Sequence, residues 1–107
     1  TGTTQTPDWS RGTDIKLNAT SGGAGVVTVD PPTPTPGAGE HGRIISLSLR
    51  NAAGGAVTWT MNAIYVLVPA GAPVAPAGTD GTTTIIEFQW DLATSEWRER
   101  FRSNTTT

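Results

Sequence analysis

The clearest signal in the chain is an alternation of apolar and polar residues that recurs in short stretches. Residues 43–61 read RIISLSLRNAAGGAVTWTM, with apolar residues at every second position on both sides of a glycine-rich centre. Successive side chains of a strand point to opposite faces, so each half predicts a strand with one apolar face. Asn51 and the glycines of NAAGG tolerate positive φ, which predicts a hairpin joining the two strands.

Further strands are expected on both sides of this stretch. Residues 14–20 (DIKLNAT) and 26–30 (VVTVD) alternate in the same way and are separated by the glycine-rich turn SGGAG. Residues 82–90 (TTTIIEFQW) and 96–102 (EWRERFR) flank a short turn. We expect these last two strands to pair.

Residues 63–68, AIYVLV, are almost continuously apolar. Such a run predicts a strand covered on both faces, either by the rest of its own fold or by a neighbouring subunit. Tyr65 and Leu67 are therefore candidates for self-association.

Proline and glycine mark the connections. Residues 31–42 read PPTPTPGAGEHG, and prolines cannot donate ladder hydrogen bonds, so this segment is expected to run as a stiff crossover between sheets or as a surface loop. A polyproline ligand is the alternative. Residues 69–81, PAGAPVAPAGTDG, carry little charge for a solvated loop, which favours a packed contact.

Short strands separated by glycine and proline predict an all-β fold, an antiparallel β-sandwich or jelly-roll-like domain of six to seven short strands. The composition agrees, with 13 Gly, 8 Pro and many Thr. We expect an extended N-terminal arm at residues 1–13, a single domain at 14–102 and a polar C-terminal tail at 103–107.

Two groups of side chains are candidate partner contacts. Trp9 and Arg11 lie in the aperiodic arm, where a tryptophan that docks on another protein would act as an anchor. The alternative is that Trp9 folds back onto its own domain. Alternation places Arg98, Arg100 and Arg102 on one face of the last strand, either as a solvated edge or as a contact with an acidic partner. The other tryptophans, Trp59, Trp90 and Trp97, fall on apolar faces and are expected in the core.

The sequence offers little chemistry. The chain has no cysteine, and its one histidine, His41, lies beside Glu40 without a recognisable nucleophile motif. The acidic residues are scattered and form no metal-binding motif. We therefore expect no enzymatic activity, no metal and no cofactor. The net charge of -2 and the short apolar runs predict neither a nucleic-acid partner nor a membrane span.

Residues 42–102 resemble small β domains of tailed bacteriophage virions. The resemblance rests on GRIISLSLRNAAGGAVTWTMNAIYVLVPAGAP and PAGTDGTTTIIEFQWDLATSEWRER: a strand, a glycine turn, an aromatic strand, a Pro/Gly/Ala loop and a final pair of strands. It implies a structural part of a head, tail or fibre, often a trimer, with no active-site motif.

These observations together predict a capsid decoration protein. We expect it to form a homotrimer that is assembled in the host cytoplasm. It would bind the major capsid protein, or another virion protein, on the outer surface of the head and stabilise the lattice. The alternative is a tail-fibre or carbohydrate/receptor-binding module that stacks an exposed tryptophan on sugar rings.

Overall fold

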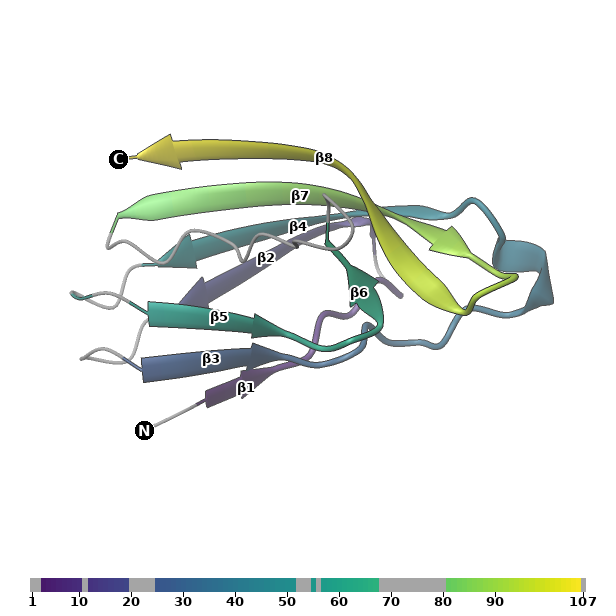
Figure 1. Ribbon diagram of the computed structural model, residues 1–107, viewed down its shortest axis with the longest axis horizontal. Coiled ribbons are helices and arrows are strands. Elements are labelled where there is room, and N and C mark those ends of the chain that lie inside the picture. The colour runs from purple at the N-terminus through teal and green to yellow at the C-terminus, as the bar shows by residue number, and fades with distance from the viewer. Residues whose placement is uncertain are drawn as a thin grey trace.

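In a computed structural model the chain folds into two β-sheets that face each other (Figure 1). The structure describes residues 3–10, 12–19, 25–51, 55, 57–67 and 81–106. These residues form strands and one short 3-10 turn, with no α-helix among them, which confirms the all-β prediction. The elements are β1 (Thr3–Gln5), β2 (Asp14–Ala19), β3 (Gly25–Val29), η1 (Ala38–Glu40), β4 (Ile44–Asn51), β5 (Val57–Met61), β6 (Tyr65–Val66), β7 (Thr82–Asp91) and β8 (Glu96–Thr106).

The two sheets differ in strand direction. The three-stranded sheet has the order β1-β3-β5, and both of its pairs are parallel. The five-stranded sheet has the order β2-β4-β7-β8-β6, with antiparallel pairs at β4–β7 and β7–β8 and parallel pairs at β2–β4 and β6–β8. The prediction of an antiparallel fold is therefore wrong for the three-stranded sheet and right for the centre of the larger one.

Strands β1 to β5 alternate between the two sheets, and we call this part, Thr3–Met61, the alternating segment. The predicted hairpin between residues 43 and 61 is wrong, because β4 and β5 lie in different sheets. Apolar alternation determines which side of a strand faces the core, but it does not determine which strand lies next to it. The side chain of Asn51 is buried at the end of β4 and donates to the carbonyl of Gly55 at 2.8 Å.

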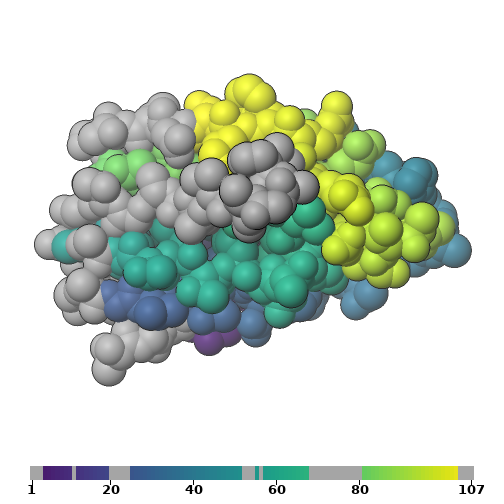
Figure 2. All heavy atoms as spheres, viewed as in Figure 1, coloured from purple at the N-terminus to yellow at the C-terminus, as the bar shows by residue number. Residues whose placement is uncertain are grey.

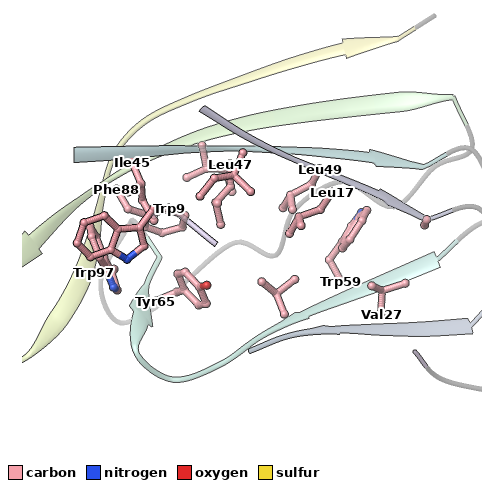
Figure 3. Packing of buried hydrophobic residues seen from close by; sticks show 14 of the residues in the cluster. Trp9, Leu17, Val27, Ile45, Leu47, Leu49, Trp59, Tyr65, Phe88 and Trp97 are labelled. Atoms are coloured by element: carbon pink, nitrogen blue, oxygen red, sulfur yellow. The ribbon is translucent and has the colours of Figure 1, made fainter. Parts of the chain in front are cut away.

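The core lies between the sheets (Figure 3). Trp59 lies near Val27 and Leu17 at one end, whereas Trp9 and Trp97 pack together at the other, with ring centroids 6.2 Å apart. Trp90 adds a second contact to Trp97 at 5.2 Å. The expectation that Trp59, Trp90 and Trp97 are core residues is confirmed.

Residues 3–10, which precede β2, belong to the domain instead of extending away from it. Strand β1 pairs with β3, Pro7 is fully buried, and Trp9 is only 8% exposed. The proline-rich connection holds this segment, because the N–H of Trp9 donates to the carbonyl of Thr33 and the N–H of Thr33 donates to the carbonyl of Pro7, both at 2.8 Å. This connection crosses from β3 in one sheet to β4 in the other, as predicted for a structural crossover.

The last strand is longer than predicted. Strand β8 continues to Thr106 and pairs there with Thr82, so most of the expected polar tail is part of the sheet. Of the expected strand at residues 63–68, Tyr65–Val66 form β6, and residue 68 lies outside the described residues. Arg11 and residues 69–80 of the predicted Pro/Gly/Ala loop lie outside the described residues.

Candidate contact surface

A β-bulge interrupts the pairing of β7 with β8. Glu87 pairs with Phe101 and Phe88 pairs with Glu99, so Arg100 is an extra residue on β8 without a direct partner on β7. One inserted residue reverses the inside–outside alternation of every residue that follows it. The bulge thus turns Phe101 outward and Arg102 inward, opposite to the orientations that uninterrupted alternation predicts.

The result is an exposed aromatic side chain on the outer face of the C-terminal hairpin, β7–β8. Phe101 is 59% exposed, although every other Trp, Tyr and Phe of the chain is buried. Ile85, which is 37% exposed, lies two residues before Glu87, the cross-strand partner of Phe101. Atoms of β8, yellow-green to yellow, form part of the surface seen in Figure 2. We call Ile85, Arg98, Arg100 and Phe101 the hairpin surface.

The structure separates the three arginines that the sequence placed together. Arg98 and Arg100 are exposed on the outer face, where Arg98 contacts Asp91 at 3.1 Å and Arg100 lies 3.8 Å from Glu87. Arg102 instead faces inward, with 15% of its side chain exposed. The prediction that all three share one face is therefore wrong for Arg102, and the cause is the bulge at Arg100.

Arg102 forms a largely buried ion pair with Glu99. Its Nε donates to one carboxylate oxygen at 3.0 Å and its Nη2 to the other at 2.8 Å. The carboxylate is 7% exposed, and the two-point geometry is the strong form of such a pair. The bulge makes this pair possible, because it brings residues 99 and 102 onto the same face of β8.

The two candidate self-association residues face the protein interior. Tyr65 is buried, and its hydroxyl donates to the carbonyl of Asp30 at 2.7 Å. Burial, with a smaller contribution from the charge of Asp30, raises the pKa of the Tyr65 phenol well above its usual value. Leu67 is half-buried and packs against the same core. The domain's own fold therefore covers Tyr65, which was one of the two alternatives for the apolar run.

The turn between β7 and β8 is held by polar contacts of Asp91. Desolvation acts to raise the pKa of this carboxyl, but hydrogen bonds from Thr94, from the Ala93 N–H and from Arg98 outweigh it, so the pKa is lowered. The Ala93 N–H donates at 3.0 Å. Next to this turn, Nδ1 of His41 accepts a hydrogen bond from the Leu92 N–H at 3.2 Å, which gives His41 a structural contact.

The described residues contain no group of three or more His, Asp or Glu side chains placed to hold a metal ion. No helix among them is long and apolar enough to cross a membrane. Glu40, the acidic neighbour of His41, instead pairs with Arg43 at 2.7 Å, and the Arg43 guanidinium lies 5.2 Å from the ring centre of Trp9.

Phe101 and Ile85 were not predicted as contact residues. The sequence gives one signal for Ile85, because the adjacent pair Ile85-Ile86 forces one apolar side chain outward in any strand. It gives no such signal for Phe101, since simple alternation from Trp97 places residue 101 inside. No protein-family model, no curated protein and no solved structure matches this chain.

Proposed function

We propose that this domain is a non-enzymatic structural protein of a tailed bacteriophage virion that decorates the outside of the head. Support for the virion comes from the resemblance of residues 42–102 to small virion domains. Two facing sheets around one core fit a β-sandwich, as the resemblance implies, although a jelly roll is antiparallel and the β1-β3-β5 sheet is parallel.

The observation that carries a contact function is the outward position of Phe101. Exposing the apolar surface of a large aromatic side chain to water is unfavourable, so a partner that covers Phe101, which is 59% exposed, lowers the free energy. Aromatic and arginine side chains are enriched at the centres of protein interfaces. Phe101 has Arg98 and Arg100 on its own strand, so one surface contains both residue types.

The partner that we propose is the major capsid protein or another virion protein, contacted through the hairpin surface. Arg98 and Arg100 retain the contact role expected from the sequence, with Phe101 as the anchor. Trp9 and Arg102 have no part in this proposal, because the domain itself buries them. A domain that binds only the assembled shell stabilises that shell by mass action.

The test uses particles purified on a density gradient from a culture that produces the phage encoding this chain. An antibody against the domain should detect it on intact heads. Recombinant domain added to heads that lack it should bind, and Phe101→Ser should reduce binding at least about tenfold without unfolding the domain. Val26→Ser, which removes another exposed apolar side chain on β3 of the other sheet, is the control. Absence of the protein from purified particles, or equal binding by Phe101→Ser, would contradict the proposal.

The carbohydrate-binding alternative required an exposed tryptophan. All four tryptophans are buried, with exposures of 8% or less, so none offers a ring face for a sugar. No observation of the structure favours that alternative over a protein contact.

A further inference from the structure

Strand β2 is an edge of the five-stranded sheet, and no strand among the described residues pairs with its outer side. It lies at one end of the order β2-β4-β7-β8-β6 and pairs in parallel with β4. The Ser46 N–H donates to the carbonyl of Thr13 at 2.7 Å. In a parallel pair, alternate residues direct both their N–H and C=O groups toward the neighbouring strand. The backbone groups of Thr13, Ile15 and Leu17 therefore point toward β4. The backbone groups of Asp14, Lys16 and Asn18 therefore point away from the sheet.

One contact confirms this direction. The side chain of Gln5 donates to the carbonyl of Asn18 at 2.9 Å, from outside the β2–β4 pair. Gln5 thus caps one outward group at the end of β2. Among the described residues, no strand pairs with the outward groups of Asp14 and Lys16. An edge strand with free backbone groups is a template for another strand.

The side chains of Asp14 and Lys16 are exposed, and neither forms an ion pair with a described residue. Edge lysines usually oppose strand pairing, because a second strand brings another charge or an apolar surface against them. In the sequence Asp14-Ile15-Lys16, however, one register of strand pairing places each lysine opposite an acidic residue. If two antiparallel copies of β2 meet with their Ile15 residues opposite each other, each Asp14 lies across from a Lys16.

We propose that two copies of this chain associate through their β2 strands, antiparallel about Ile15. Each Asp14 then exchanges backbone hydrogen bonds with Lys16 of the second copy, because both residues direct these groups outward. Two opposite-charge cross-strand pairs result. The competing register centred on Lys16 places two lysines opposite each other and is disfavoured. Charge thus selects a single two-fold arrangement, with the five-stranded sheets joined across the interface.

This interface is small, because one six-residue strand from each copy supplies it. We therefore expect the association to depend on protein concentration. The β2 interface does not use the hairpin surface, so this proposal does not rest on the proposed function. Strand β2 and the hairpin surface are separated by β4 in the strand order. A dimer through β2 leaves Phe101 exposed for a virion partner.

The experiment is a charge exchange followed by sedimentation velocity over a range of protein concentrations. Wild type should shift from one chain mass toward two as concentration rises. Lys16→Asp leaves only acidic residues at the two positions, and Asp14→Lys leaves only basic ones, so each variant alone should dissociate about tenfold more readily. An equimolar mixture of the two variants should restore association, because every Asp then faces a Lys of the other variant.

Arg50→Asp is the matched control. Arg50 is exposed on β4, one strand away from the edge, and its substitution changes net charge by the same amount as Lys16→Asp. Arg50→Asp should associate like wild type, and circular dichroism should show that all variants are folded. Three results would overturn the proposal. Wild type could stay monomeric, it could form a trimer that neither substitution dissociates, or the mixture of the two variants could fail to associate.

Discussion

The alternating segment and the C-terminal hairpin use similar strands in opposite ways. In the hairpin, β7 and β8 are consecutive and pair antiparallel across one short turn. Within the alternating segment each pair joins strands two positions apart in the chain, and the pairs β1–β3, β3–β5 and β2–β4 are all parallel. The same apolar–polar alternation thus occurs in strands that pair antiparallel and in strands that pair in parallel.

The two regions meet at Trp97, which carries the largest expected effect. Trp97 of β8 is fully buried and packs against Trp9 of the alternating segment. Trp97→Ala should lower the free energy of unfolding by about 3–5 kcal/mol, through lost burial and the cavity left behind. Chemical denaturation measures this. Hydrogen exchange should also show faster exchange of the Trp9 N–H, which donates to the Thr33 carbonyl, because Trp9 loses its packing partner.

Trp59→Ala tests whether the two ends of the core respond independently. Trp59 lies at the other end of the core and is 2% exposed. Its substitution by alanine should lower the free energy of unfolding by a similar amount. It should leave the Trp9 indole in its native environment, observed as an unchanged emission signal from the Trp9–Trp97 cluster. If both variants accelerate exchange of the Trp9 N–H equally, the two ends of the core are not distinguishable and the comparison fails.

The sequence predicts the hairpin well and the alternating segment only in part. The positions of β2, β4, β5 and β7 follow from alternation because burial requires it. Their neighbours do not follow, since strands from either topology have the same period. The hairpin surface is missed for a related reason: the bulge at Arg100 adds one residue to the register without a glycine or proline to mark it. The position of Trp9 depends on distant contacts with Thr33 and Trp97, which no local pattern contains.

The next prediction compares the inward ion pair of β8, Glu99–Arg102, with the outward pair, Glu87–Arg100. Glu99→Ala leaves Arg102 largely buried without its carboxylate and should cost about 2–3 kcal/mol. Glu87→Ala removes the exposed partner of Arg100, a pair at 3.8 Å, and should change stability by less than about 0.5 kcal/mol. Thermal and urea unfolding of both variants gives the comparison. Equal losses would show that the bulge does not divide β8 into inner and outer arginines.

A smaller effect is expected at the junction of β6 with the connection after β3. Tyr65→Phe removes the hydrogen bond to Asp30 and should cost about 1 kcal/mol at neutral pH. The raised pKa of Tyr65 means that the folded state keeps the phenol protonated after the unfolded state begins to lose its proton. This contribution is complete below about pH 10 and is lost as the pH rises above it.

Wild type should therefore lose stability more steeply than Tyr65→Phe in alkaline solution, and the two curves should converge. Urea unfolding at several pH values between about 8 and 11 measures the convergence. A constant difference between the two proteins would mean that the Tyr65 hydroxyl ionises without penalty, contrary to its burial in the core.

The smallest effect belongs to the turn of the hairpin. Asp91→Asn keeps an acceptor for the Ala93 N–H but loses the charge that faces Arg98. Because the folded state lowers the pKa of Asp91, its contribution is present above the pKa of the unfolded state, about 3.9, and is lost as the pH falls through the folded value. The variant should unfold at a slightly lower temperature than wild type at pH 7, and the difference should vanish in acid. A difference that persists unchanged at about pH 2 would assign the effect to amide geometry instead of charge. Either result concerns contacts within eight residues of sequence, which explains why this turn, unlike the parallel sheet, could be located from the sequence alone.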